Sequence, residues 1–297
     1  MTPERPVFIG GASGSGKTQV RMVLGAHPDL AMTRRTRLWD RFHGRFGDLA
    51  DPRNLDRCLR AIVADEGAAI LAPDPARIRR ELAAGPVTYA RIFGLLHRHH
   101  AERLGRRRWG DQLGGVERFA DPIFAEFPDA RMIHMVRDAR ADALRHGRGA
   151  WGGLGWRTAE WVASARVADR NRRRYPGRYI VVRFETLVAD PRATLERLCT
   201  EIGETFVPSM ERMLASIAWD RTDASRDANE ARTVRSTAFV DRYAGSDLEA
   251  FDYPAARRVR LGGLDRVAFE LLERPVNRLS MAARRALDAG TATRRRA

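Results

Sequence analysis

A glycine-rich turn near the N-terminus has the residue types that bind phosphate. Gly11 and Gly16 are separated by four residues and are followed by Lys17 and Thr18. Glycines let the backbone wrap around an anion so that its N–H groups converge on the oxygens, and the dipole of a following helix adds favourable potential. The order of residues satisfies the Walker A pattern. We therefore predict that a nucleotide phosphate binds in this turn, through Gly11, Gly14, Ser15, Gly16, Lys17 and Thr18.

Lys17 stands out in the composition of the chain. Of its 53 basic residues, only Lys17 is a lysine and all the others are arginines. An ammonium is a compact point charge and a guanidinium is a planar fork, so the two are not interchangeable on a phosphate. We predict that Lys17 contacts terminal phosphate oxygens and acts in catalysis, and that the Thr18 hydroxyl ligates Mg²⁺ or donates to a phosphate.

Three further residues are candidates for binding or proton transfer. Arg137 follows the apolar run 132–136, and ligands of open parallel sheets bind at the carboxyl ends of the strands. His43 and Asp111 lie in polar segments and carry side chains that can accept a proton in catalysis. Each of the three also has an ordinary interpretation as a solvated or surface residue.

A metal site is not expected. Cys58 and Cys199 have no Cys-x-x-Cys spacing, and His97, His99 and His100 lack a carboxylate or cysteine at ligand spacing. Consecutive helical positions also do not face the same way. We therefore interpret the cysteines as reduced thiols and assign no metal ligands.

The elements that must position these residues follow from the apolar pattern. Residues 7–9, 132–136 and 179–182 are short apolar runs, and each precedes a segment with helical spacing. Asp190 and Pro191 are typical of a helix start, and a glycine at position 203 ends that helix. Strands that are apolar throughout indicate a parallel sheet with both faces buried. The predicted class is α/β, with the P-loop fold.

The remaining segments suggest one large domain. Residues 34–108 have mostly helical spacing, and we expect them to form a helical insertion that covers the site. We predict a single domain over residues 1–290. Residues 291–297 form a basic tail that we expect to be disordered.

Composition limits the possible partners. The formal net charge is +15, which attracts phosphate-bearing molecules of any size. Nucleic acid is not expected as the main partner, because the arginines are spread along the chain without a recognisable nucleic-acid-binding motif. No apolar run approaches the roughly 20 residues that cross a bilayer. We expect a soluble, cytoplasmic protein, and the sequence leaves its oligomeric state open.

Three separate stretches resemble the sulfotransferases that use 3′-phosphoadenosine 5′-phosphosulfate (PAPS). Residues 7–29 are similar to the family's 5′-phosphosulfate loop and following His-Pro, residues 127–140 to its 3′-phosphate segment, and residues 179–195 to its Tyr-Glu-Asp-Leu and Asp-Pro stretch. The resemblance implies that Arg137, with Arg145, holds the 3′-phosphate. It also implies transfer of a sulfuryl group to a hydroxyl or amine of a small-molecule acceptor.

The chain departs from that family at functional positions. Gly14 stands where the family has a cation, Lys17 where it commonly has threonine, and Arg145 where it has a serine. Lys17 can supply the missing charge to the sulfuryl group. The alternative is that ATP with Mg²⁺ replaces PAPS and the enzyme is a small-molecule kinase, in which Lys17 binds the β- and γ-phosphates. In that case Asp138 or Asp111 supports the metal ion or accepts the acceptor's proton. A third possibility is a nucleotide-binding protein without catalytic activity.

Overall fold

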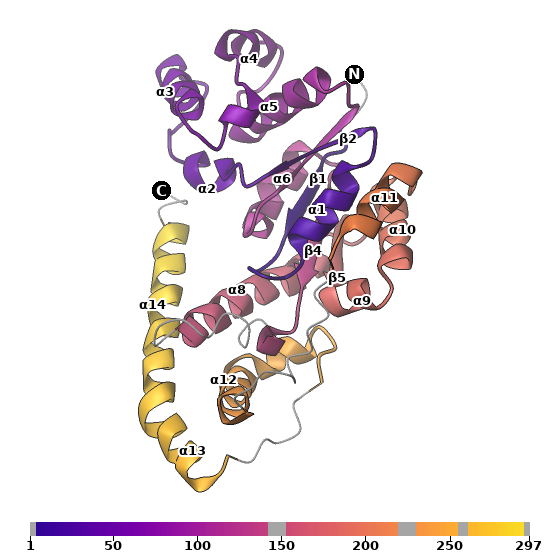
Figure 1. Cartoon of the computed structure of the whole chain (residues 1–297). Coiled ribbons are helices and arrows are strands. Elements are labelled where there is room, and N and C mark those ends of the chain that lie inside the picture. The colour runs from indigo at the N-terminus through magenta and orange to yellow at the C-terminus, as the bar shows by residue number, and fades with distance from the viewer. Residues whose placement is uncertain (1–3, 142–152, 219–229, 255–260, 294–297) are drawn as a thin grey trace.

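A five-stranded parallel sheet forms the centre of the protein (Figure 1). The computed structural model describes residues 4–141, 153–218, 230–254 and 261–293. The strand order is β2-β3-β1-β4-β5, and every neighbouring pair is parallel. The α/β class is therefore confirmed. The strands are β1 (Val7–Gly10), β2 (Leu30–Arg34), β3 (Arg108–Gln112), β4 (Arg131–Val136) and β5 (Tyr179–Arg183).

The two strands β2 and β3 were missed by the apolar pattern, which identified only β1, β4 and β5. Strand β3 reads Arg-Trp-Gly-Asp-Gln, yet all five residues are buried. Its polar groups are satisfied by distant parts of the chain, since Thr33 donates to Asp111 and the Arg108 guanidinium donates to the Arg5 carbonyl. A strand of this kind cannot be recognised from periodicity, because its partners are fixed only by the tertiary structure.

Helices cover both faces of the sheet. Helix α1 (Lys17–Gly25) follows β1 directly, and four helices lie between β2 and β3, in the segment interpreted as a helical insertion. These four are α2 (Leu38–Phe42), α3 (Pro52–Val63), α4 (Pro75–Leu82) and α5 (Tyr89–Arg103), with a short 3₁₀ turn at Ala69–Leu71. The later helices are α6 (Ala120–Glu126), after a 3₁₀ turn at Val116–Phe119, and α8 (Gly153–Arg174), α9 (Phe184–Ala189), α10 (Pro191–Ile202), α11 (Pro208–Ser216) and α12 (Glu230–Glu249).

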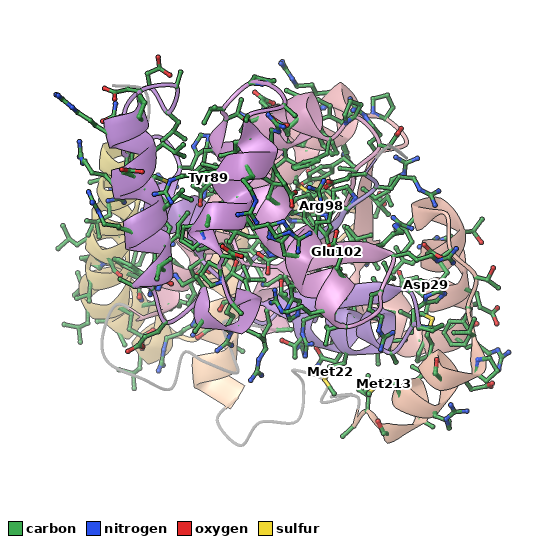
Figure 2. The ribbon with its side chains drawn as sticks, turned by 90° about the horizontal axis from the view of Figure 1, so that it is seen from above. Met22, Asp29, Tyr89, Arg98, Glu102 and Met213 are labelled. Carbon is green, nitrogen blue, oxygen red and sulfur yellow. The ribbon has the colours of Figure 1, made fainter. Side chains whose placement is uncertain are left out.

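Alternate residues of β1 supply the two cores. Val7 and Ile9 pack with residues of α1 and α10 on one face, while Phe8 stacks on Phe93 of α5 on the other. Helix α11 packs against α1 on the first face, and Met22 and Met213 are neighbours there in Figure 2. Because both faces are covered, the strands can be apolar at every position, as predicted.

Helix α10 begins and ends at the predicted residues. The Asp190 side chain accepts a hydrogen bond from the backbone N–H of Ala193 at 3.0 Å, and Pro191 occupies the first turn. Gly203 adopts a φ of 75° and ends the helix. These are the capping roles that aspartate, proline and glycine usually have.

The C-terminal helices form one long run that packs on α8. Helix α13 (Gly263–Ala268) continues through a π-helical turn (Phe269–Glu273) into α14 (Arg274–Thr293). Of the residues expected to form a disordered tail, 291–293 belong to α14 and 294–297 lie outside the described residues. Among the described residues, no helix is both long and apolar enough to span a bilayer.

Candidate nucleotide-binding site

The predicted phosphate loop connects β1 to α1. Gly11, Gly14 and Gly16 have φ values of 120°, 78° and 92°, in the range that favours glycine. A Cβ atom on Gly11 would lie 2.2 Å from the Met135 carbonyl oxygen, and one on Gly16 would lie 2.4 Å from the Phe184 ring. Both glycines are therefore required by their backbone conformation and by the close approach of β4 and α9.

Lys17 lies inside this loop. Its side chain is largely buried, and Nζ donates to the Gly11 carbonyl at 2.8 Å and to the Ala12 carbonyl, and lies 3.4 Å from Ser15 Oγ. Ser15 is buried, whereas Thr18 is exposed at the start of α1. The ammonium thus donates hydrogen bonds to two carbonyl oxygens of the loop and places a positive charge within it.

Two N–H groups of the loop already bind carboxylates. The Gly11 N–H donates to Glu117 Oε2 at 3.2 Å, and the Ser13 N–H donates to Glu160 Oε1 at 3.3 Å. Carboxylates at these positions indicate that the loop amides attract anionic oxygens. The residues present therefore fit a phosphate or sulfate group, and Glu160, which is only half-buried on α8, occupies a position such a group can take.

Arg137 lies at the carboxyl end of β4, close to the loop. Its guanidinium carbon lies 4.3 Å from the centre of the Phe184 ring, and that same ring faces Gly16. The backbone carbonyl of Arg137 accepts a hydrogen bond from the Trp161 indole at 2.7 Å. The structure thus places Arg137 and the loop on either side of the Phe184 ring. Arg145 lies outside the described residues.

A cleft of about 390 Å³ opens beside the loop. The loop residues Gly11 and Ala12 form part of its wall, and His43 of the helical insertion forms another part. Helix α8 contributes Glu160, and α14 contributes Arg284. The cleft is therefore bordered by the phosphate loop, by one of the two predicted proton acceptors and by the C-terminal helix.

Asp111 occupies a different position. Its side chain is fully buried between β2 and β3, where Oδ1 accepts from the Thr33 hydroxyl at 2.8 Å and Oδ2 from the Thr36 hydroxyl at 2.9 Å. It is not among the residues that line the cleft. Both carboxylate oxygens are engaged in holding two segments together, which is a structural role.

A buried polar chain that the sequence analysis missed lies behind the loop. Tyr179 shares a hydrogen bond with His134 Nδ1 at 2.9 Å, and His134 Nε2 lies 3.5 Å from the Ser164 hydroxyl. Ser164 in turn donates to Glu117 Oε1 at 2.7 Å. The chain ends at Gly11, whose N–H is bound by the same carboxylate. It therefore ties β4, β5 and α8 to the first residue of the loop.

Burial controls the protonation of this chain. Burial lowers the pKa of His134 to about 4, although the Glu117 carboxylate acts in the opposite direction. Burial raises the pKa of Glu117, but the nearby His134 and the Ser164 hydrogen bond outweigh it, so that this pKa lies below its ordinary value. Near neutral pH the chain therefore contains a neutral imidazole and a charged carboxylate. The sequence signal for Glu117 was its position just after a strand end, but β3 was not recognised.

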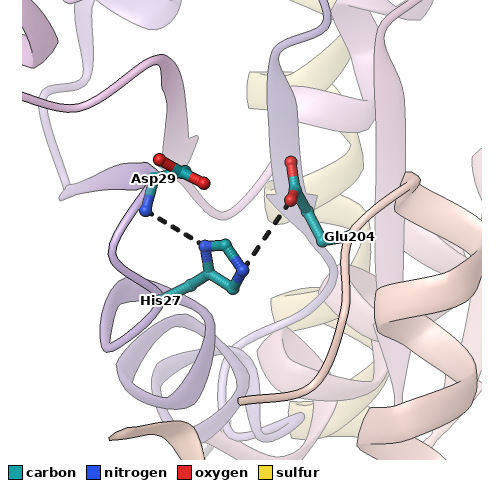
Figure 3. Close-up of side chains that lie close together, drawn as sticks. All are labelled: His27, Asp29 and Glu204. Atoms are coloured by element: carbon teal, nitrogen blue, oxygen red, sulfur yellow. Dashed lines mark hydrogen bonds and ion pairs between the residues drawn. The ribbon is translucent and has the colours of Figure 1, made fainter.

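One group of side chains has the types of metal ligands, and the structure gives it another explanation. His27, Asp29 and Glu204 lie together at the end of α1 (Figure 3). However, Asp29 forms an ion pair with Arg107, and Glu204 forms one with Arg108. His27 Nδ1 also accepts the Asp29 backbone N–H at 3.1 Å. These arginines neutralise the carboxylates, so we interpret the cluster as a clamp between α1, β3 and the end of α10.

The parallel sheet and the glycine-rich turn between β1 and α1 define an α/β protein with the P-loop type of fold. Residues 6–208 match the profile described as the sulfotransferase family. This match covers more than half of the chain, and the chain therefore belongs to the sulfotransferase family. The resemblance noted in the sequence is confirmed.

Individual relatives are distant. The chain is 28% identical over 162 residues to the omega-hydroxy-beta-dihydromenaquinone-9 sulfotransferase Stf3 of Mycobacterium bovis and to that of Mycobacterium tuberculosis. The match covers 46% of this chain and 40% of each relative, so it spans less than half the length of these curated proteins. The sulfotransferase domain of the Synechococcus PCC 7002 olefin synthase superposes with a TM-score of 0.51 at 20% identity, covering 90% of this chain and 93% of that one. This structural similarity supports the fold.

Proposed function

We propose that this protein transfers a sulfuryl group from PAPS to a hydroxyl or amine of a small-molecule acceptor. The proposal rests on the glycine-rich loop of this sulfotransferase family member, whose backbone N–H groups bind carboxylates. Arg137 lies near this loop and stacks on the Phe184 ring. The 5′-phosphosulfate would replace the Glu160 carboxylate on the Ser13 N–H. Arg137 would bind the 3′-phosphate, together with Arg145, which stands in the sequence where the family has the serine that helps to hold this phosphate.

The reaction requires orientation and charge stabilisation. The acceptor oxygen or nitrogen attacks sulfur, the bond from sulfur to the 5′-phosphate oxygen breaks, and the nucleotide 3′,5′-bisphosphate (PAP) leaves with the bonding electrons. The loop N–H groups and Lys17 stabilise the charge that develops on the sulfuryl and bridging oxygens. No metal ion is needed for this role, because the charge of Lys17 is already inside the loop.

We assign proton acceptance to His43 in preference to Asp111. His43 lines the cleft together with Gly11 and Ala12, and its ring packs at 5.0 Å from that of Trp39, which holds it in place. Asp111 is buried with both oxygens engaged by threonines. A proton acceptor must reach the acceptor's proton directly or through one water, and the position of His43 satisfies this condition better.

The kinase alternative has less support. A kinase would need carboxylates for Mg²⁺, and the two candidates are both engaged elsewhere, Asp111 by threonine hydroxyls and Asp138 by an ion pair with Arg140 at 2.9 Å. Family membership also favours sulfuryl transfer, because the match covers both the loop and Arg137.

Calorimetric titration with PAP and with ADP, each with and without Mg²⁺, tests the donor. We expect tight binding of PAP that does not depend on Mg²⁺, and weak binding of ADP. In the Arg137→Ala variant, PAP affinity should fall on the order of tenfold or more, since a charge-assisted contact contributes about 1.5–3 kcal/mol, while ADP affinity should change little.

Two results would contradict the proposal. A preference for ADP with Mg²⁺ would identify a kinase on this fold. Equal losses of PAP and ADP affinity in Arg137→Ala would show that Arg137 does not read the 3′-phosphate. Lys17→Ala serves as the positive control, because it should weaken both nucleotides by removing the charge that they share.

A further inference from the structure

The C-terminal helical run carries an apolar stripe on its outer side. Six large apolar side chains are more than half exposed between residues 264 and 287, and Leu264, Leu271 and Leu279 are 89%, 70% and 72% exposed. Elsewhere in the part of the chain that the structure describes, only three large apolar side chains are exposed. The outer stripe consists of Leu264, Val267, Leu271, Leu272, Leu279 and Leu287.

The spacing of the stripe places it on one side of the helices. Apart from the adjacent pair Leu271 and Leu272, its successive members are three, four, seven or eight residues apart, which are the intervals that share a helix face. The opposite side is the packed one, because Phe269, Asn277 and Met281 are buried there. Asn277 Oδ1 accepts a hydrogen bond from the Gly155 N–H at 3.0 Å, which fixes the run on α8. In Figure 1 the run forms the outer edge of the molecule, with α8 and α12 on its inner side.

The exposed charged side chains described beside the stripe are all positive. Among the side chains of this run whose exposure the structure describes, the exposed charged ones are Arg266, Arg278 and Arg285. Arg278 and Arg285 are seven residues apart and share a face next to Leu279. The acidic side chains whose exposure is described are all engaged, because Glu270 forms an ion pair with Arg274, Glu273 one with Arg235 and Asp288 one with Arg284. The border of the stripe is therefore basic.

We propose that this face binds peripherally to a bilayer that contains anionic lipid. A helix with leucines on one side and arginines along the border lies in the membrane interface, where its apolar side enters the acyl boundary and its cations contact headgroup phosphates. The net charge of +15 also favours attraction of the protein to an anionic bilayer. A second copy of the chain is a weaker candidate, because pairing two such faces brings like-charged borders together.

The docked orientation has a consequence for the cleft. Arg284 and Asp288 of α14 line the cleft beside the phosphate loop. A bilayer bound to the outer side of α14 therefore lies one helix away from the space in which an acceptor would bind. The proposal itself does not depend on sulfuryl transfer, because membrane binding is measured separately from nucleotide binding and turnover.

Cosedimentation of the full chain with vesicles tests the proposal. The vesicles are pure phosphatidylcholine, or phosphatidylcholine containing phosphatidylglycerol. We expect the chain to pellet with the anionic vesicles and much less with the neutral ones. The double variants L271E/L279E and R278E/R285E should each lower the apparent affinity for anionic vesicles by on the order of tenfold or more, because each removes apolar burial or headgroup attraction.

Controls separate this surface from general effects. Ile70 and Leu104 are each 54% exposed in the distant helical insertion, so the double variant I70E/L104E adds the same two charges away from the stripe and should leave pelleting unchanged. All changed side chains are exposed, so melting temperature and PAP affinity should match those of the unchanged chain. Failure to pellet with anionic vesicles, or equal pelleting of L271E/L279E, overturns the proposal. A dimer by light scattering that L271E/L279E dissociates also overturns it in favour of a second copy.

Discussion

His43 and Asp111 both have side chains that can accept a proton, but their surroundings in the fold differ. His43 lines the cleft, and Asp111 accepts hydrogen bonds from Thr33 and Thr36 in the interior. If His43 is the proton acceptor, His43→Gln should lower kcat by roughly 10²–10⁴. Radiolabelled transfer from PAPS to an acceptor chosen from an alcohol panel measures this.

Asp111→Asn is the matched comparison for that prediction. An amide keeps the shape of the carboxylate but offers only one oxygen to the two threonine hydroxyls, so the melting temperature should fall while kcat stays close to that of the unchanged enzyme. A large loss of kcat in Asp111→Asn without a change in melting temperature would assign the base to Asp111 instead.

The buried His134 makes the stability of the protein depend on pH. In the unfolded chain a histidine binds a proton near pH 6.5, but in the folded chain the pKa of His134 is about 4. The unfolded state therefore binds more protons between these values, and the free energy of unfolding should fall as the pH decreases from 6.5 to 4. The full shift corresponds to roughly 3 kcal/mol.

His134→Asn isolates this contribution. The asparagine oxygen can accept the Tyr179 hydroxyl as Nδ1 does, but it does not titrate. Burial also lowers the pKa of His97, His99 and His100, and these act in the same direction in both proteins. Chemical denaturation at several pH values should thus give a flatter profile for the variant. Parallel profiles would show that His134 does not titrate as described.

At the scale of elements, the connection between β1 and α1 depends on the contact of Gly16 with Phe184. In Gly16→Ala the added methyl group would lie 2.4 Å from an atom of the Phe184 ring, and the alanine would have to adopt a φ of 92°, which is strained for any residue with a side chain. We expect a loss of about 1–3 kcal/mol in stability and a clear loss of PAP affinity, because the Phe184 ring also contacts Arg137. Thermal melting and calorimetry measure the two effects.

Gly177 provides the control for this variant. It has a φ of 71° between α8 and β5, but an added Cβ there would meet no atom within 4 Å. Gly177→Ala therefore carries the backbone strain without the steric contact and should not change PAP affinity. If both variants bind PAP equally well, the approach of Phe184 to the loop does not organise the site.

At the scale of the whole molecule, the C-terminal helix becomes part of the site through its packing on α8. An added Cβ at Gly155 would lie 1.9 Å from the Asn277 carbonyl oxygen. Because this is a backbone atom, Gly155→Ala should push α14 away from α8, with a loss of about 1–3 kcal/mol. Hydrogen exchange should increase in α14 before it increases in the sheet.

Gly153→Ala is the control on the same helix, since a Cβ at Gly153 would meet no atom within 4 Å. Unchanged exchange in α14 of Gly155→Ala would show that the helices do not depend on this close approach. A matching increase in both variants would indicate an effect on α8 itself.

Local chemistry made part of this protein predictable. The glycines and the preceding apolar run predicted the turn between β1 and α1, because a turn with positive φ angles needs glycine. That this turn, with Lys17, binds phosphate stays a prediction. The caps of α10 and the three apolar strands were predicted for the same reason, since each depends on residues that are near one another in sequence. The family resemblance followed from these local segments.

Only the tertiary structure decided which polar residues belong to the site. Strand β3 has a polar sequence, and its burial depends on Thr33, Thr36 and Arg5, which are far away in the chain. Glu117 was not recognised for this reason, and neither was the packing of α14 beside the cleft. Hydrogen bonds and packing between distant segments determine whether a polar side chain is solvated, buried in a network or exposed to a ligand. These contacts cannot be predicted from the periodicity of the sequence.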